Sequence, residues 1–194
     1  MPKITVITSE TGHNLHALLD AHQTQNLKDG EITLVVSSDE NALRAAQKAG
    51  IDTLAKPDDD AELLKQVATH KPDLIVALDT PHGLNADFLK KFSHQIIAVY
   101  PALAGQFTDY KPIDSAFKAF QKNEIKWTGC HVHYVDSGET MRQLVVPIEP
   151  KESMQRFAAR MRKGENWLLL KGVKQYLYEL RNRNKRSTTS QSET

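Results

Sequence analysis

Short apolar runs alternate with amphipathic segments along the first hundred residues. The apolar runs lack polar alternation, which is typical of strands buried on both faces of a sheet. Between them, apolar residues recur at helical spacing, as Leu15, Leu18 and Leu19 do after the turn at Gly12. The pattern predicts strands at 4–7, 31–36, 51–55, 74–78 and 96–99, and helices around 15–19, 42–49, 58–67 and 86–92.

The second half of the chain is less regular. It predicts a helix at 113–122, strands at 127–135 and 144–148, and a helical pattern over 154–180 that Gly164 could break or kink. Residues 181–194 are basic and then rich in Ser and Thr, so we predict a disordered tail there. Residues 1–180 are then expected to form a single domain.

Alternating strands and helices are typical of an α/β protein. We predict a Rossmann-like open, mostly parallel twisted sheet with helices on both faces. Ligands of such sheets bind beyond the carboxyl ends of the strands. This rule selects three segments for a site, which are 9–14, 79–83 and 100–112.

Composition and charge narrow the classes of function. The formal net charge is +1, but the tail carries four bases and one acid, so residues 1–180 carry a net −2. Such a domain is a poor nucleic-acid scaffold, and we expect no nucleic-acid partner. The single cysteine, Cys130, excludes an intrachain disulfide. Without an apolar run near ~20 residues or a signal-peptide pattern, we expect no membrane partner and a cytoplasmic location.

The turn between the first strand and first helix is a candidate anion site. Backbone N–H groups at a helix N-terminus suit a phosphate, which makes Gly12, His13 and Asn14 candidate binding residues. The alternative is that these small polar residues only turn and cap the chain. Glu10 favours that alternative, since it places a negative charge beside the anion.

Two histidines lie at alternate positions of a predicted strand. His131 and His133 should share one face of the sheet and could approach a metal ion. No third ligand follows at a recognisable spacing, so we expect no metal site. His133 is instead a candidate proton carrier or hydrogen-bond donor.

Two further segments have both a functional and a structural interpretation. Tyr100 and Pro101, with Asp109, Tyr110 and Asp114 downstream, form either a wall of the site or a solvated crossover. The basic run at 181–186 could touch RNA or an acidic lipid surface, but a solubilising end is favoured.

Several segments, taken in order, resemble the folate-dependent glycinamide-ribonucleotide formyltransferases of purine synthesis. The family pattern Ser-Gly-x-Gly-Ser-Asn-Leu corresponds to residues 9–15, which depart from it at Glu10 and His13. Other resembling segments are 49–51, 71–76, 84–89, 129–135 (Gly-x-x-Val-His-x-Val in the family) and 162–167, where a Glu-His pair reads Glu165-Asn166. The resemblance covers about residues 3–180 and implies the formyltransferase fold.

The match fails on the strand that carries the family's chemistry. The family motif Asn-x-His-Pro reads here as residues 98–101. The resemblance thus places Ala98 at the oxyanion-stabilising asparagine, Tyr100 at the proton-donating histidine and, without gaps, Thr140 at the general-base aspartate. Removing one oxyanion donor typically costs ~10²–10³ in rate. With all three replaced, we expect the parent reaction to be absent or altered.

The cofactor is implied by the resemblance alone. The family uses 10-formyltetrahydrofolate, but its folate-binding Gly-Phe-Met-Arg loop is not matched by residues 79–82. Its Leu-Pro-x-x-x-Gly segment is also replaced, at 104–109.

Three functions follow as alternatives. The first is a formyltransferase-fold protein that has lost the parent reaction and binds a phosphorylated or nucleotide-like small molecule. The second is a formyl or acyl transferase with a rebuilt site, for which His133, Tyr100 and Asp136 are the catalytic candidates. The third is a non-catalytic interaction protein, suggested by the basic tail and altered loops. A homodimer is left open.

Overall fold

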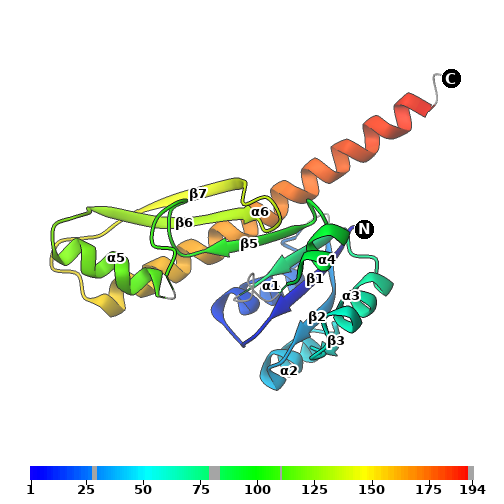
Figure 1. The fold of residues 1–194 in the computed structure, drawn as a ribbon, viewed down its shortest axis with the longest axis horizontal. Helices are drawn as coiled ribbons and strands as arrows, with labels where there is room; N and C mark the ends of the chain where they lie inside the picture. Colours follow the sequence, from blue (N-terminus) through cyan, green and yellow to red (C-terminus); the bar gives the residue numbers. More distant parts are fainter. Residues whose placement is uncertain (28–29, 79–83, 110, 192–194) are drawn as a thin grey trace.

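The computed structural model describes residues 1–27, 30–78, 84–109 and 111–191. Its strands form one mixed sheet in the order β3-β2-β1-β4-β5-β6-β7 (Figure 1). The strands are β1 (Lys3–Thr8), β2 (Glu31–Ser37), β3 (Asp52–Ala55), β4 (Leu74–Ala77), β5 (Ile96–Tyr100), β6 (Trp127–Tyr134) and β7 (Thr140–Pro147). Strands β1 to β5 pair in parallel, whereas β5–β6 and β6–β7 are antiparallel. The predicted mostly parallel α/β sheet is confirmed.

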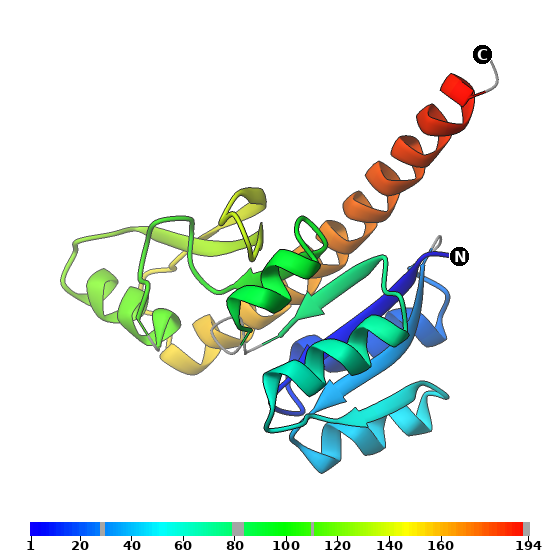
Figure 2. The ribbon, with the colours of Figure 1, turned by 45° about the vertical axis from the view of Figure 1, so that its right-hand side comes forward.

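Helices cover both faces of the sheet. They are α1 (His13–Gln23), α2 (Glu40–Lys48), α3 (Asp60–Thr69), α4 (Ala86–Lys91), α5 (Pro112–Gln121) and α6 (Met154–Gln191). Leu15 and Leu18 of α1 pack with α6 against the strand side chains of one face, such as Val6. Side chains of α3 and α4, such as Phe88, pack on the opposite face against Ile7 and its neighbours. Figure 2 shows α3 and the parallel strands from this side.

The antiparallel strands continue beyond the carboxyl end of β5. Tyr100 pairs with His131, so the earlier residues of β6 extend past the last residue of β5. This extension, α5 and the first turns of α6 enclose a small apolar core, in which Phe117 and Phe157 stack at 5.7 Å between ring centroids. Figure 1 shows this part beside the parallel strands. This packing places the first turns of α6 near the carboxyl-end edge of the parallel strands, where the predicted site lies.

Helix α6 differs in two respects from the sequence-based predictions. It runs without a break through Gly164, where an added Cβ would lie 3.1 Å from Leu144 Cδ2, so the glycine permits close packing of α6 on β7. Residues 181–191 continue α6 as helix, which differs from the disordered tail predicted from composition. They extend a helix whose inner turns are already fixed by buried side chains such as Leu177, so adding a turn needs no new nucleation. The end of α6 projects from the body (Figures 1 and 2).

The β6–β7 hairpin is tighter than its sequence predicts. Strand β7 begins at Thr140 instead of Leu144, because Thr140 already pairs with His133. The amide of Gly138, which has a φ of 71°, donates to the Tyr134 carbonyl and closes the turn. Among the helices within the described ranges, none is long and apolar enough to cross a membrane.

Candidate functional site

The turn from β1 into α1 is held in place by the next strand–helix connection. The amide and hydroxyl of Thr11 both donate to Asp39 Oδ2, at 2.8 and 2.6 Å. Asp39 also accepts from the Asn41 amide and thereby caps α2. The Thr11 hydroxyl bond, followed by the Asn41 amide, lowers the pKa of Asp39. The turn is therefore a fixed element of the fold.

The N-terminus of α1 has no capping side chain. Its N-cap residue is Gly12, whose backbone is extended and which offers no side-chain oxygen to the first turn. A helix leaves its first amides without intrahelical acceptors, and its dipole favours an anion there. The predicted candidates Gly12, His13 and Asn14 thus lie at an end of α1 with donors to offer, as an anion site requires.

A buried carboxylate of α6 approaches this end of α1. His13 Nε2 lies 3.5 Å from Glu165 Oε2, and the Glu165 side chain is only 5% exposed. Glu165 Oε1, Asn14 Oδ1 and Asn166 Oδ1 are buried and have no hydrogen-bond partner among the described residues. Buried polar atoms are normally paired, so the unpaired oxygens of Asn14 and Glu165 point to a missing partner. The acceptor oxygens call for a ligand with hydroxyl or amine donors.

Cys130 lies in the same neighbourhood as Glu165. Burial, and then the negative charge of Glu165, raises the pKa of the Cys130 thiol to about 12. The cysteine therefore stays a neutral thiol packed in the core, and it is no nucleophile.

The histidine pair lies on the opposite face of β6. Successive residues of a strand point to opposite faces, so His131 and His133 share a face that Cys130 and Val132 do not. Their ring centroids are 4.9 Å apart, and the Tyr100 ring lies 5.8 Å from His131. The structure thus brings the candidates His133 and Tyr100 onto one face.

The two histidines differ in their hydrogen bonding. His131 Nδ1 lies 2.7 Å from the Ala102 carbonyl, so it carries a proton and donates it. His133 Nδ1 is buried without a hydrogen-bond partner within the described part of the chain. Burial, followed by the charge of His131, lowers the pKa of His133 to about 4. His133 is consequently neutral near pH 7 and is suited to accept a proton or a hydrogen bond.

The hydroxyl of Tyr100 is already engaged by the loop that follows β5. It lies 3.0 Å from the Phe107 carbonyl and 2.8 Å from the Asp109 carbonyl, to which it donates. Burial and the nearby Asp109 carboxylate raise the pKa of Tyr100 above its usual value. Tyr100 thus ties the loop that follows it to β5.

The third catalytic candidate, Asp136, lies at the other end of β5. Its Oδ2 accepts from the Ser93 hydroxyl and the His94 amide, at 2.9 and 2.8 Å. Burial opposes its ionisation, but these two bonds outweigh burial and lower the pKa of Asp136. Residues 93 and 94 precede β5, so Asp136 is remote from Tyr100 and fastens the hairpin turn to the sheet.

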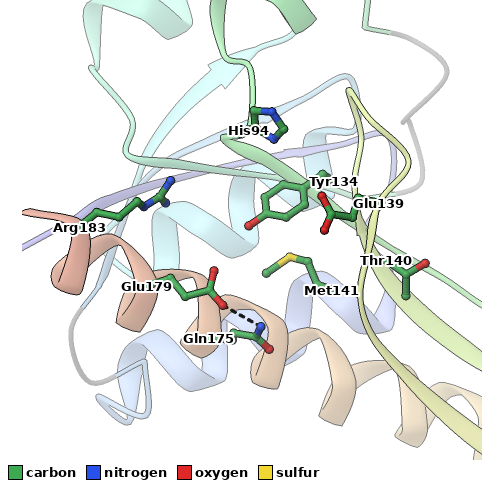
Figure 3. Close-up of a pocket in the computed structure, with 8 residues that line it drawn as sticks. All are labelled: His94, Tyr134, Glu139, Thr140, Met141, Gln175, Glu179 and Arg183. Atoms are coloured by element: carbon green, nitrogen blue, oxygen red, sulfur yellow. Dashed lines mark hydrogen bonds between the residues drawn. The ribbon is translucent and has the colours of Figure 1, made fainter.

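A hollow of about 320 Å³ lies near this hairpin turn. Figure 3 shows Tyr134, Glu139 and Met141 on one side and Glu179 of α6 on the other, with Gln175 donating to Glu179 at 2.8 Å. Thr140, which the resemblance places at the general-base position, also lines it. Burial, and then Glu179, raises the pKa of Tyr134. The hollow is separate from the candidate anion site at the N-terminus of α1, which is called the α1 site below and consists of Gly12, His13 and Asn14.

Sequence reasoning did not select Glu165 as a site residue, although a signal was present. Glu165 lies on the apolar stripe of α6, four residues after Met161 and three before Leu168, both of which are buried. A carboxylate on a buried stripe needs a partner, which marks such a position as functional. Segment 79–83 and Tyr110, which were also candidates, lie outside the described residues. In the part of the chain that is described, no three His, Cys, Asp or Glu side chains converge as a metal site.

Known proteins resemble the chain over most of its length. The model of the formyl transferase family matches residues 2–173. Phosphoribosylglycinamide formyltransferase of Schizosaccharomyces pombe is 30% identical over 90% of this chain and 96% of its own, and that of Dictyostelium discoideum is 32% identical over 88% and 96%. The phosphoribosylglycinamide formyltransferase structure from Anaplasma phagocytophilum superposes with a TM-score of 0.80 at 27% identity, over 91% of this chain and 87% of its own. The order of strands, the α1 turn and these matches together show that the chain belongs to the formyl transferase family.

Proposed function

We propose that this protein binds a phosphorylated, hydroxyl-bearing small molecule at the N-terminus of α1 and has lost the formyl transfer of the phosphoribosylglycinamide formyltransferases. One observation carries the binding half of this proposal. Beside the uncapped end of α1, Asn14 and Glu165 have buried oxygens that lack a hydrogen-bond partner among the described residues. Amide donors suit a phosphate, and the oxygens suit sugar hydroxyls. A phosphoribosyl group has both a phosphate and sugar hydroxyls, and this group appears in the names of the relatives.

The loss of chemistry is supported by what stands at the reacting positions. Ala98 is 1% exposed and contributes a methyl group where the resemblance places an amide donor. The Tyr100 hydroxyl donates to backbone carbonyls of its own loop, and its raised pKa makes it a poor proton shuttle. Thr140 has no carboxylate and pairs with His133 in the hairpin. The oxyanion donor, proton donor and base are all replaced.

These residues do not fit the formyl-group end of 10-formyltetrahydrofolate. A formyl donor needs hydrogen-bond donors directed at the developing oxyanion. The side chain of Ala98 offers none, and that of Tyr100 is engaged elsewhere. We therefore assign the folate no step in this chain. We also propose a role connected with purine biosynthesis, which the names of the relatives suggest, and a cytoplasmic location.

A formylation assay tests the lost reaction. Purified protein is incubated with glycinamide ribonucleotide and 10-formyltetrahydrofolate, and release of tetrahydrofolate is followed spectroscopically, with the S. pombe relative as the positive control. We expect no rate above the background without protein. Robust turnover would overturn the catalytic half of the proposal.

Binding is tested separately by isothermal titration calorimetry with ribose 5-phosphate. We expect saturable binding, weakened when Asn14→Ala removes one of the acceptors. Asn41→Ala on α2 is the matched control, because Asn41 lies outside the α1 site. Its backbone N–H, which the substitution keeps, makes the hydrogen bond to Asp39. Equal binding by the Asn14→Ala variant and wild type would count against the site.

A second function is favoured by one observation. His133 is neutral, half-buried, and has an unpartnered Nδ1, as a general base in a rebuilt transferase site would. Under this alternative, His133→Ala abolishes any acyl transfer to an amine that substrate screening detects, and Asp136→Asn, at the far end of the sheet, leaves it intact. Unchanged turnover of the His133→Ala variant would reject this role.

An interaction role has the projecting basic end of α6 as its basis. Size-exclusion chromatography with light scattering gives the oligomeric state. A monomer that retains no partner would remove this role, together with the homodimer left open from the sequence.

A further inference from the structure

Helix α6 presents two different faces to its surroundings. One face packs on the sheet, where Leu168, Leu169 and Val173 are each at most 1% exposed. On the face turned away from the sheet, side chains recur every three or four residues, so they follow one line along the helix for about 27 Å. This line, the α6 stripe, consists of Lys163, Trp167, Lys171, Lys174, Tyr178 and Arg181.

The α6 stripe combines positive charge with exposed aromatic rings. Trp167 is 51% exposed and Tyr178 is 66% exposed, although such large rings are normally mostly buried. The Lys171 ammonium lies 5.5 Å from the centroid of the Trp167 ring, so charge and ring adjoin each other. The two acids of α6 lie elsewhere, since Glu165 is buried and Glu179 lines the hollow of Figure 3. The stripe therefore offers basic and aromatic groups together, without a carboxylate between them.

The net charge of the whole chain conceals this arrangement. Residues 154–186 contain ten basic and two acidic side chains, a formal charge of +8, whereas the whole chain carries +1. The rest of the chain is thus net negative. The expectation of no nucleic-acid partner used the average charge of 1–180, which does not register basic residues gathered on one helix.

A line of basic residues favours a polyanion, and the rings favour one kind of polyanion. A helix that lies on a lipid surface buries a continuous apolar face at the boundary of the acyl chains. Within 163–181 the α6 stripe has no such face, because basic residues separate its two rings. An acidic polypeptide offers charge but few flat π surfaces. A nucleic-acid strand offers both, since its nucleobases stack on exposed rings while its phosphates meet Lys and Arg.

We propose that the α6 stripe binds single-stranded nucleic acid. Its Lys and Arg side chains contact phosphates, and Trp167 and Tyr178 stack on nucleobases. The two rings are eleven residues apart, about 16 Å along the helix, so each stacks on a different nucleotide. The stripe shares no residue with the α1 site, and this inference does not rest on the proposed binding of a small molecule.

Fluorescence anisotropy with a labelled oligouridylate at about 50 mM salt tests the rings. Trp167→Ala removes one stacking platform and should weaken binding about tenfold. Trp167→Phe keeps a ring and should stay within about threefold of wild type, which separates stacking from charge. Trp127→Ala is the matched control, because Trp127 is 54% exposed on β6, outside the stripe, and its loss should leave the affinity unchanged.

The salt dependence of binding tests the basic residues. Each phosphate contact releases counterions and contributes about 0.7 to the slope of log affinity against log salt for a single strand. The double variant Lys163→Gln with Lys171→Gln should therefore reduce this slope by about 1.4. Lys90→Gln with Lys91→Gln, on α4 at the opposite face of the sheet, makes the same change of charge and should leave the slope unaltered.

Thermal unfolding checks that each variant is folded, and Tyr178→Ala replaces Trp167→Ala if that variant is not. Wild type that binds phosphatidylserine vesicles but no oligonucleotide would overturn the proposal in favour of a lipid surface. Equal affinity of wild type for polyglutamate and oligouridylate, or equal oligouridylate binding by wild type and Trp167→Ala, would also overturn it, since charge alone would then explain the binding. Ribose 5-phosphate binding should be the same in wild type and Trp167→Ala, so the proposed function and this inference stand or fail separately.

Discussion

Ala98 lies directly opposite His133 in the antiparallel ladder of β5 and β6. Their side chains point to the same face, and that of Ala98 is buried. His133 Nδ1 is buried too, without a hydrogen-bond partner among the residues described. Residue 98, where the resemblance places the asparagine of Asn-x-His-Pro, and the unpaired imidazole nitrogen are therefore cross-strand neighbours.

Ala98→Asn should be tolerated better than the same change at Ala77, its neighbour on β4. Both alanines are 1% exposed and pair with each other across β4 and β5. A buried amide without a partner costs about 1–3 kcal/mol, but at position 98 it can donate to His133 Nδ1. We expect the Ala98→Asn variant to be more stable than the Ala77→Asn variant by about 1 kcal/mol, measured by urea unfolding. Equal losses would show that the His133 nitrogen is not available.

Most of the framework follows from local pattern. Runs such as 74–78 are apolar at every position, which only a strand covered on both faces accommodates, and β4 is indeed buried throughout. The helix over 181–191 differs from the predicted disorder because composition describes an isolated segment. In the structure, that segment is the continuation of a helix anchored by Leu168 and Leu177.

Of the candidate site, only the part that is continuous in sequence could be predicted. The turn at 9–15 is continuous in sequence, so a glycine before an apolar helical pattern identifies it. The approach of Glu165 to His13 depends on how α6 crosses α1, and no spacing within either helix contains that information. Asp136 is the opposite case, since it lies close to the candidate residues in sequence but far from Tyr100 in space. It follows the Val-His strand in sequence, but the tight hairpin carries it to the far end of β5, where it binds Ser93 and His94.

His133 should make the protein less stable in mild acid. Its pKa is lowered to about 4 in the folded state and lies near 6.5 when unfolded, so between these values the unfolded chain binds more protons. The stability due to neutral His133 is complete above about pH 6.5 and is lost as the pH falls toward 4. We expect the unfolding free energy to fall by about 1–2 kcal/mol between pH 7 and pH 5.

The His133→Gln variant isolates this contribution. It keeps a polar side chain but does not titrate, so its unfolding free energy, measured by urea titration at the same pH values, should change less. His70→Gln, on the opposite end of the sheet at the close of α3, should retain the wild-type pH dependence. If His133→Gln and wild type have parallel pH profiles, His133 is not the group that titrates.

Tyr100→Phe should loosen the loop that follows β5 without disturbing the strand. The change removes the hydroxyl that donates to the Phe107 and Asp109 carbonyls and leaves the ring beside His131. A typical intramolecular hydrogen bond contributes about 1 kcal/mol. We expect a loss of that size in urea unfolding and faster hydrogen exchange over 103–109. Tyr178→Phe, at a side chain that is largely exposed, should change neither.

Arg160→Lys should destabilise the first turns of α6, which lead to Glu165. Arg160 binds Glu152 in a two-pronged pair, with Nε 2.8 Å from Oε1 and Nη2 2.6 Å from Oε2, and Nη2 also donates to the Pro147 carbonyl. The Arg160 bond, ahead of opposing burial, lowers the pKa of Glu152. A lysine ammonium cannot reproduce this fork. We expect a loss of about 2 kcal/mol in urea unfolding at pH 7.

Arg156→Lys is the control for this prediction. Arg156 also faces Glu152, at 4.0 Å, but its side chain is 71% exposed. Exposed ion pairs contribute little, so this change should alter the unfolding free energy by less than about 0.5 kcal/mol. Glu152 is ionised above its ordinary pKa in both states, so the stability from its pair with Arg160 is complete near neutral pH. That stability disappears as the pH falls through the lowered pKa of Glu152, and the difference between wild type and the Arg160→Lys variant should shrink with it. A difference that stays constant down to the pH of acid unfolding would mean that Arg160 acts through packing and not through its charge.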